Sequence, residues 1–554
     1  MKFAQFAAIC EKLERTSSYI EMKKTLAQFF KNADKKDVKR AAYLLLGTIE
    51  PSYSDINLGI AENMALRSLE NAFDVKNIKA ASRKTGDIGE TAEQYAHSKP
   101  SLTIPEVFDT LHKIAAASGQ GSQDKKVNLL SSLFKKCSAI EARYLARLCL
   151  GQLRLGVGDK TILEALADAF ADKSAKKDLE HAFTIRPDIG TIAQTLADKG
   201  INAVRRIGVQ VGTPIQMMLC QRIENLEELK QRTGFPVAVE TKYDGERIQA
   251  HKKGKIITLF SRRLENITKQ FPEITEALLK LTGDFIVEGE AVAVDANGGI
   301  LPFQTMMQRR RKHNVEEYSK KIPVALKLFD CLYFNSKTLM SKSYPERYTA
   351  LAKLLKKGKT LQLADRTLCS NSSCADEFFQ NIVVGGGEGI VIKSLKADSS
   401  YQAGVRGWHW IKWKPEYVKG MRDTFDLVVV GAYFGRGRRA GKYGALLCAA
   451  YDDKNDKFET FCKLGTGFKD TDLAHFFKLL KRTDTKPALV NCSTAMEPDV
   501  WVVPEIVVEV AGAEITKSPT HTTGYALRFP RFLRIREKKP EQATSVKEIK
   551  KMIN

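Results

Sequence analysis

The sequence lacks features that define whole classes of protein. No apolar run in its 554 residues approaches the roughly 20 residues that a membrane-spanning helix needs. A signal-peptide pattern is absent, since Glu11, Lys12 and Glu14 interrupt any apolar segment near the start. We find no internal repeat and no long low-complexity linker. These absences argue against a membrane protein and predict an intracellular one.

Patterns typical of structural metal sites are also scarce. The 10 cysteines include no C-x-x-C, and Cys369 and Cys374 form the closest pair. The 8 histidines show no paired ligand spacing. We therefore expect reduced thiols, no structural zinc, and a location in the cytoplasm or, in a prokaryote, the nucleoid.

The charge balance is strongly one-sided. Apolar residues make up 43% and charged residues 28%, which is ordinary for a globular protein, but the net charge is +23. The length predicts about three or four domains. An excess of positive charge indicates a polyanionic partner, with nucleic acid the first candidate and an anionic membrane surface the second.

The stretch 240–247, ETKYDGER, is the centre of the functional argument. Residues 237–239 alternate as in a strand, which predicts a strand that ends near Lys242. Residues 248–260 fit two strands joined at a turn, Lys253-Gly254. Lys242 is therefore expected where the chain leaves a strand and turns.

Two arginines are expected near this lysine. Counting back from the turn places Arg262 opposite Gly245, so the hairpin would return it to Lys242, and Arg247 ends the central stretch. A lysine amine attacks only when unprotonated, and burial or nearby cations favour that state. Both arginines also suit bidentate phosphate binding. Taken alone, Lys-x-Asp-Gly is most often an ordinary surface turn, so the other motifs decide.

Acidic and aromatic residues lie on two further predicted strands. In residues 285–292 the period of two puts Glu288 and Glu290 on one face. Two carboxylates on a buried face need a metal, a cation or a ligand hydroxyl, whereas a solvated edge strand is the alternative. Residues 326–330 form the next strand, in which Phe329 is either a core residue or a ligand contact.

Glycines and paired lysines follow downstream. In residues 385–393 the glycines permit close backbone approach around Glu388, ahead of a strand. In residues 410–414, Lys412 and Lys414 share one face. An amphipathic edge strand explains this spacing, and so do two ammonium groups directed at a phosphate on which charge develops.

Residues 1 to about 210 fit amphipathic helices. Phe3, Phe6, Ala7 and Cys10 have helical spacing, and Asp159 is a candidate cap for a later helix. Basic residues between the apolar faces form a candidate phosphate-tracking surface, although each alone fits an ordinary solvated face. They are Lys135, Lys136, Arg143, Arg147, Arg154 and Lys160.

The last part of the chain is rich in short predicted strands. Residues 427–430, 444–451 and 506–510 are candidate strands of a small barrel. A Gly-Arg loop, 435–439, suits phosphate contact, and the basic run 309–312 is either solvated or a DNA contact.

Taken in order, these motifs resemble the covalent nucleotidyltransferases, specifically the ATP-dependent DNA ligases of archaeal and eukaryotic type. NAD-dependent DNA ligases carry a four-cysteine zinc module, which this chain lacks. The resemblance implies that Lys242 carries AMP, Glu240 reads the adenine amino group and Phe329 stacks on adenine. It also implies nucleotide binding by Arg247, Arg262, Glu290, Lys412 and Lys414, and metal binding by Glu290 and Glu388.

The final motif matches the family imperfectly. Residues 528–539 resemble the last ligase motif, which orients pyrophosphate and would assign nucleotide binding to Arg534 and Arg536. The family usually follows its final arginine with x-Asp-Lys, whereas this chain has Glu537-Lys538-Lys539. An aspartate is therefore missing at this position.

The resemblance implies a multidomain protein. We expect an all-α DNA-binding domain at 1–212, an α+β nucleotidyltransferase (adenylation) core at 213–418 and an OB-fold β-barrel at 419–554. The implied activity is ATP-dependent sealing of 5′-phosphate/3′-hydroxyl nicks in duplex DNA through lysine–AMP and DNA-adenylate intermediates, in replication, repair and recombination. ATP and Mg²⁺ are the expected cofactors, with Mn²⁺ as a substitute.

Several alternatives stay open at this point. An RNA ligase or an mRNA-capping guanylyltransferase shares the lysine chemistry, and a DNA-binding protein with a decayed site is the non-catalytic alternative. Use of ADP or NAD⁺ is compatible with the sequence. We expect a monomer bound to nicked double-stranded DNA and no membrane association. A sliding clamp is a further expected partner by resemblance, although no convincing clamp-binding peptide is found.

Overall fold

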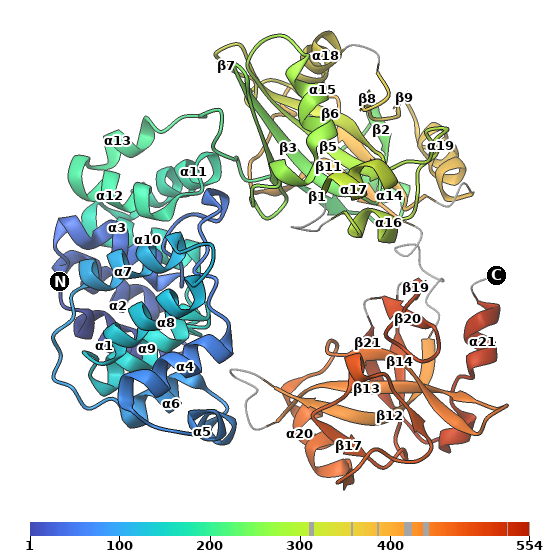
Figure 1. Ribbon diagram of the computed structural model, residues 1–554. Helices are drawn as coiled ribbons and strands as arrows, with labels where there is room; N and C mark the ends of the chain where they lie inside the picture. The colour runs from blue at the N-terminus through green and yellow to red at the C-terminus, as the bar shows by residue number, and fades with distance from the viewer. Residues whose placement is uncertain are drawn as a thin grey trace. The chain divides into compact units, whose positions relative to one another are not determined.

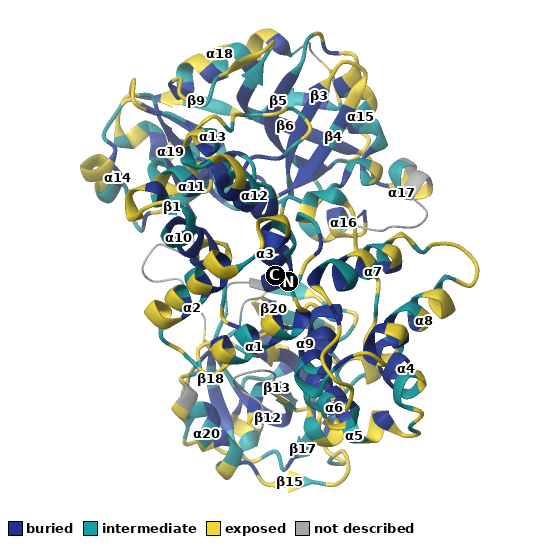
Figure 2. Cartoon of the chain, turned by 90° about the vertical axis from the view of Figure 1, so that its left-hand side faces the viewer, coloured by how far each residue is buried: buried dark blue, intermediate teal, exposed yellow. Residues whose placement is uncertain are grey.

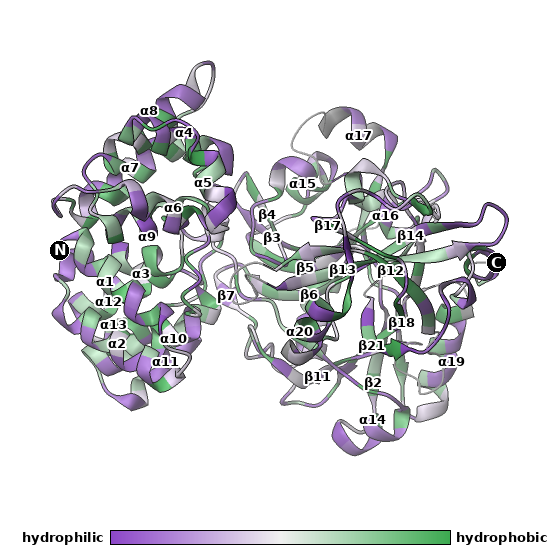
Figure 3. Ribbon diagram, turned by 90° about the horizontal axis from the view of Figure 1, so that it is seen from below, coloured by the Kyte–Doolittle hydropathy of each residue, from purple (hydrophilic) through white to green (hydrophobic). Residues whose placement is uncertain are grey.

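Apolar residues at helical spacing bury one face of each helix in the first region of the chain. The predicted face of Phe3, Phe6, Ala7 and Cys10 is fully buried in α1 (Phe3–Glu14), which confirms that prediction. Figure 3 shows the mixture of hydrophobic and hydrophilic residues along these helices, which is the pattern of helices that pack on one side only.

The structure is a computed structural model that describes residues 1–309, 315–355, 358–384, 387–414, 424–435, 442–512, 514–528 and 530–552. The chain divides into two compact units, Met1–Lys414 and Pro415–Asn554, and each is described by itself. Among the residues so described, no helix has both the length and the apolar character needed to cross a membrane.

Helices account for the first region, as predicted (Figure 1). Asp159 is the first helical residue of α10, and Gly158 stands at the cap position without a side-chain hydrogen bond, so the prediction of Asp159 as the cap is wrong by one residue. After α1 the helices are α2 (Tyr19–Asn32), α3 (Val38–Leu45), α4 (Glu62–Phe73), α5 (Ile78–Thr85), α6 (Ile88–Tyr95), α7 (Ile104–Ala116), α8 (Ser122–Phe134), α9 (Ala139–Cys149), α10 (Asp159–Phe170), α11 (Lys176–Ile185), α12 (Ile189–Lys199) and α13 (Ile201–Arg205).

One member of the predicted basic surface belongs to the interior of this region. Arg147 is 2% exposed, and its guanidinium donates to Asp87 at 3.0 Å and to Glu14 at 2.8 Å. A buried guanidinium with two carboxylate partners holds helices together and is unavailable to a DNA phosphate. Lys135, Lys136 and Lys160 are exposed, as a phosphate-tracking surface requires.

Two β-sheets form the next region. The five-stranded sheet has the order β1-β11-β10-β2-β9, and the six-stranded sheet contains β4-β3-β5-β6-β7 with β8 on β6. The strands are β1 (Leu219–Arg222), β2 (Val237–Thr241), β3 (Glu246–Lys253), β4 (Ile256–Ser261), β5 (Phe285–Ala293), β6 (Val324–Phe334), β7 (Lys337–Thr338), β8 (Leu361–Leu363), β9 (Arg366–Cys369), β10 (Ile390–Ser394) and β11 (Arg406–Trp413). The accompanying helices are α14 (Leu226–Arg232), α15 (Pro272–Leu279), α16 (Phe303–Met307), α17 (Val315–Lys321), α18 (Tyr344–Leu354) and α19 (Ser372–Val384).

Strand alternation gives the five-stranded sheet two different faces. One face is apolar and packs with residues of α14 and α19; it carries Val237, Val239, Ile390, Ile392, Ile411 and Trp413. Successive side chains alternate across a strand, so the opposite face carries Glu240, Lys393, Trp410 and Lys412. Figure 2 shows that strands of the neighbouring six-stranded sheet, such as β5 and β6, also consist mostly of buried residues.

The second unit is a curled β structure, as the OB-fold prediction requires. Bulges interrupt the pairing of β12 with β13 and of β13 with β14, which bends the strands. The elements are β12 (Thr424–Phe434), β13 (Tyr443–Asp452), β14 (Lys457–Leu464), α20 (Asp470–Leu479), β15 (Arg482–Thr483), β16 (Val490–Asn491), β17 (Val500–Val502), β18 (Val507–Ala511), β19 (Glu514–Lys517), β20 (Tyr525–Arg528), β21 (Arg531–Arg536) and α21 (Val546–Lys551). The predicted fold class is thus confirmed: helical, then α+β, then OB-fold. Most of the Gly-Arg loop 435–439 and of the basic run 309–312 lies outside the described residues.

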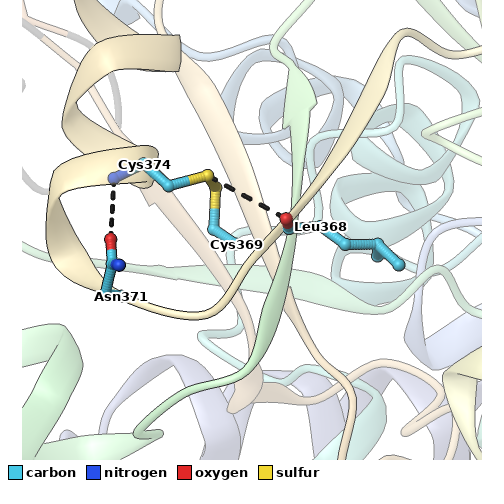
Figure 4. Close-up of a disulfide and its surroundings, with 4 residues drawn as sticks. All are labelled: Leu368, Cys369, Asn371 and Cys374. Atoms are coloured by element: carbon cyan, nitrogen blue, oxygen red, sulfur yellow. Dashed lines mark hydrogen bonds between the residues drawn. A yellow bond between two sulfur atoms is a disulfide. The ribbon is translucent and has the colours of Figure 1, made fainter.

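Two cysteines correct the expectation of reduced thiols. Cys369 ends β9 and Cys374 lies in the first turn of α19, and a disulfide joins them (Figure 4). The tight turn between strand and helix brings their Cα atoms to 5.4 Å, within the range of a disulfide. Because their spacing is longer than C-x-x-C, the pattern search missed the pair. The other eight cysteines are free.

Candidate active site

Lys242 lies in the short link between the two sheets. It directly follows β2, and its backbone N–H donates to the carbonyl of Gly389 at 2.9 Å. Gly245 closes the link, and a Cβ there would stand 2.3 Å from the carbonyl oxygen of Ala291 on β5. The backbone around Lys242 is therefore fixed on both sides, and the prediction that it ends a strand is confirmed.

A single carboxylate receives two ammonium groups at this position. Nζ of Lys242 and Nζ of Lys414 both contact the carboxylate of Glu388, which precedes β10. Burial raises the pKa of Glu388, but the two ammonium groups together lower it by more, so the net shift of its pKa is downward. The group is partly open: the side chains of Lys242 and Glu388 are 21% and 23% exposed.

A third cation lies on the same face. Lys412 is on β11, and Lys414, two residues later and just past the end of that strand, has the same alternation parity. Burial lowers the pKa of Lys412, and the charges of Lys242 and Lys414 contribute to the lowering. Such a cluster of cations suits negative charge that develops on a phosphate.

Glu290 adds an acidic group on the six-stranded sheet. It pairs with Arg247 across β5 and β3. Burial raises its pKa to about 8, although the nearby cations of Lys242 and Arg247 act in the opposite direction. A half-buried carboxyl that would be stabilised by a further positive charge, near the carboxylate of Glu388, fits Mg²⁺. This ion takes one or two protein carboxylates and completes its shell with phosphates and water. The described residues contain no group of three or more His, Cys, Asp or Glu that could hold a metal ion.

Arg247 has partners that the sequence did not indicate. Its Nη1 donates to the carbonyl of Met218 at 2.8 Å and its Nη2 to Glu288 at 2.9 Å. The guanidinium also lies 5.5 Å from the ring centroid of Phe329 and 5.4 Å from that of Trp410. Both terminal nitrogens are therefore engaged, and the expected bidentate phosphate grip does not describe this arrangement.

The predicted register of Arg262 is wrong. The ladder pairs Lys253 with Ile256, so the turn consists of Gly254 and Lys255 rather than Lys253 and Gly254. A turn one residue later shifts the register by two, and the ladder ends at Ser261 paired with Ile248. Arg262 is exposed in the following turn, and continuing the register puts it level with Arg247 instead of Gly245.

Glu240 lies buried on the same sheet face as Lys412. It is 2% exposed, its Oε1 accepts from the hydroxyl of Tyr344, and its Oε2 lies 2.8 Å from Nζ of Lys393. Sequence reasoning missed the roles of Tyr344 and Lys393. The usable signal was the position of Lys393, a lysine directly after the apolar run of β10.

Phe329 lies on β6 beside these groups. Its ring meets that of Trp410 edge to face with centroids 5.8 Å apart, and Phe329 itself is only partly buried. A partly exposed aromatic ring of this kind can stack on another flat ring.

The last motif forms its own polar group within the second unit. On β21, Nε of Arg534 donates to Glu509 at 2.6 Å, and Nη1 of Arg536 donates to the same oxygen at 3.2 Å. The hydrogen bond from Arg534 is the main cause of the lowered pKa of Glu509. Lys538, next to the missing aspartate, contacts Asp426 of β12 at 2.6 Å.

A helical region, a two-sheet core with a lysine at the link, and an OB-fold define a nucleotidyltransferase of ligase type. Three family models match the chain: "DNA ligase N terminus" over residues 2–167, "ATP dependent DNA ligase domain" over 217–414 and "ATP dependent DNA ligase C terminal region" over 439–539. The chain belongs to the ATP-dependent DNA ligases.

Relatives of full length support this assignment. DNA ligase 1 of Methanosarcina mazei is 43% identical, with 99% of each chain covered. DNA ligase 2 of Thermofilum pendens is 42% identical, covering 100% of this chain and 97% of the relative. A solved chain named "Pmar-Lig_Pre." shares the fold at a TM-score of 0.59 and 18% identity, with 96% of this chain and 99% of that chain covered.

Proposed function

We propose that Lys242 is the nucleophile of an ATP-dependent DNA ligase reaction. The observation that carries this assignment is the position of its Nζ, in a backbone link held from both sides, against a carboxylate shared with Lys414. The unprotonated Nζ attacks the α-phosphorus of ATP, an N–P bond forms, and the bond to pyrophosphate breaks. The AMP then passes to the 5′-phosphate of a nick, and the 3′-hydroxyl displaces it.

The surrounding residues divide the work of binding and charge neutralisation. Lys412 and Lys414 face the α-phosphate, Glu240 accepts from the adenine amino group, and Phe329 stacks on the base. The support is the common strand face of Glu240 and Lys412, the position of Phe329 beside Trp410, and the cation cluster described above. Arg247 orders this part of the site through its hydrogen bond to Glu288. Arg262 is exposed, so it would contact a phosphate from the solvent side.

The family uses ATP and a divalent metal, typically Mg²⁺, for which Mn²⁺ is a substitute. Glu290 and Glu388 would hold it. When bound, the metal neutralises phosphate charge during transfer. In this chain Glu388 also keeps Nζ of Lys242 at the link.

The substrate is nicked double-stranded DNA, on which this family acts. We assign duplex binding to residues 1–212, adenylation to 213–418 and closure over the nucleotide to the OB-fold at 419–554. The assignment of duplex binding to residues 1–212 is supported by three exposed lysines that could contact phosphates: Lys135, Lys136 and Lys160. We further propose a monomer that acts inside the cell in replication, repair and recombination, with a sliding clamp as an additional partner.

The test is labelling of the full chain with ATP radiolabelled at the α-phosphate. The label should stay on the protein in a denaturing gel, because the N–P bond is covalent, and should move to DNA when a nicked duplex is added. Nicks with RNA strands test the RNA-ligase alternative. A chain that binds nicked DNA without ever taking up label would contradict the proposal.

Arg534 and Arg536 allow the reaction steps to be separated. If they orient pyrophosphate, Arg534→Ala and Arg536→Ala should slow adduct formation from ATP more than the sealing of a nick that already carries AMP. Equal losses in both assays would assign these residues to the whole reaction instead.

A further inference from the structure

The interior beneath the candidate nucleotide site contains a second lysine. Lys393 is 1% exposed, and its ammonium group lies 2.8 Å from Oε2 of Glu240. Its Nζ also donates to the backbone carbonyl of Phe329 at 3.1 Å. Lys393 belongs to the five-stranded sheet and Phe329 to the six-stranded sheet, so one ammonium group ties the two sheets together.

Three aromatic rings enclose this ammonium group. Nζ of Lys393 lies 4.5 Å from the ring centroid of Phe329, 4.7 Å from that of Tyr344 and 4.5 Å from that of Trp410. Tyr344 also donates its hydroxyl to the other oxygen of Glu240. A buried charge persists only when it is paired and hydrogen-bonded, and Lys393 and Glu240 satisfy this condition for each other.

We propose that Lys393 is a specificity-determining positioning residue, which holds the carboxylate of Glu240 ionised and oriented to accept from the 6-amino group of a purine nucleotide. The inference rests on the proposed role of Glu240. An ionised carboxylate offers about four acceptor positions, so donation from Lys393 and Tyr344 leaves capacity for a base. The 6-oxo group of guanine is itself an acceptor and would meet that carboxylate unfavourably.

The 6-amino contact is isolated by comparing ATP with purine riboside triphosphate, which lacks only that group. We measure kcat/KM for adduct formation on the full chain with both nucleotides and with GTP. Wild-type protein should favour ATP over purine riboside triphosphate by roughly 10- to 100-fold, the range of a hydrogen bond to a charged group. Lys393→Met should bring this ratio close to 1 by reducing only the reaction with ATP, and Tyr344→Phe should lower it partially.

Two further variants separate selectivity from folding. Lys252→Met removes another buried lysine, which donates only to the carbonyls of Leu279 and Leu281, and should keep the wild-type ratio. The double variant Glu240→Met/Lys393→Met removes both charges of the pair, and its ratio should equal that of Lys393→Met alone.

The outcomes distinguish the two claims. A wild-type ratio in Lys393→Met, together with a collapsed ratio in Glu240→Met, would overturn the proposal for Lys393 and keep Glu240 as the base reader. An unchanged ratio in Glu240→Met would overturn the role of Glu240 and with it that of Lys393. A ratio that falls further in the double variant than in Lys393→Met would mean that Glu240 reads the base without help from Lys393, against the positioning role. A ratio lower in the double variant than in Glu240→Met would mean that Lys393 contacts the base itself, which also contradicts that role.

Discussion

Two lysine–glutamate pairs connect the β2 segment with the β10 segment. In one pair the lysine comes from the β2 segment, and in the other it comes from the β10 segment. The β2 segment supplies Glu240 and then Lys242, and the β10 segment supplies Glu388 and then Lys393. The pair Lys242–Glu388 is partly open, at 21% and 23% side-chain exposure, whereas Lys393–Glu240 is sealed, at 1% and 3%. Both are ammonium–carboxylate pairs, but they differ in solvation and in their further partners: Lys414 also contacts Glu388, whereas Tyr344 also donates to Glu240.

This difference separates a pair whose partners can be exchanged from a pair that stays fixed. A partly solvated ion pair contributes little to stability, so a substrate phosphate can replace one of its partners at small cost. A sealed pair is costly to break, because the remaining partner stays buried without a counter-charge. The protein thus has an exchangeable charge pair at Lys242 and a fixed, buried pair in the neighbouring part of the same sheet.

Breaking the open pair should give the largest effect on activity. Lys242→Arg keeps the positive charge, but the guanidinium stays protonated and cannot attack. We expect a folded protein that binds nicked DNA and forms no adduct in a denaturing gel. Lys255→Arg, at the exposed hairpin turn, is the matched control and should label normally. An adduct on Lys242→Arg would assign the nucleophile elsewhere.

Breaking the sealed pair should give the largest effect on stability. Lys393→Met leaves Glu240 buried without its cation, and such a loss costs about 3–5 kcal/mol. Glu240→Met/Lys393→Met should recover most of it, and Lys242→Met should cost no more than about 1 kcal/mol. Denaturant unfolding of the three variants measures this. A similar loss for Lys242→Met and Lys393→Met would remove the distinction between the pairs.

His251, another buried residue of the core, predicts a pH dependence of stability. Burial lowers the pKa of His251 to about 3, while its Nδ1 accepts from the N–H of Gly212 at 3.0 Å. The folded pKa lies below the unfolded one, near 6.5, so the unfolded state binds more protons between these values and stability falls as the pH falls. From pH 7 to pH 5 this group should cost about 2 kcal/mol.

The measurement is unfolding free energy against pH for wild type and His251→Asn. The variant should lack this part of the slope, while the carboxylates titrate alike in both proteins. Parallel slopes would mean that His251 is protonated in the folded state at pH 5.

The smallest effect is expected from an exposed pair in the second unit. Arg534 is 64% exposed and contacts Glu509 at 2.6 Å. Arg534→Ala should therefore change the unfolding free energy by no more than about 1 kcal/mol, even though it slows adduct formation. Thermal unfolding beside a labelling assay separates the two effects, and a large loss of stability would make Arg534 structural.

The sequence predicted what depends on local periodicity. Alternation predicted that Lys412 and Lys414 share one face, and the structure buries Ile411 and Trp413 on the other. The helical spacing of Phe3 and Phe6 identified a buried face. Register was less secure, because a turn displaced by one residue moved Arg262 by two positions.

Tertiary pairing was the part that local patterns do not encode. Tyr344 reaches Glu240 from a helix 104 residues away, and no spacing rule connects them. Arg147 has the sequence context of a surface cation, but its carboxylate partners are Glu14 at the end of α1 and Asp87, which caps α6. The bridge of Cys369 and Cys374 depends on the turn that brings the end of a strand onto a helix.

The close approach of Gly245 to the carbonyl of Ala291 has a consequence for how this site can vary. Loops usually accept insertions. In this link, however, even a single methyl group on Gly245 would clash with β5 and displace the backbone that carries Lys242. The backbone position of Lys242 is therefore coupled to the distance between this link and β5. New substrate preferences in such a core would have to arise from residues that line the pocket, while the length of the stretch from Lys242 to Gly245 stays constant.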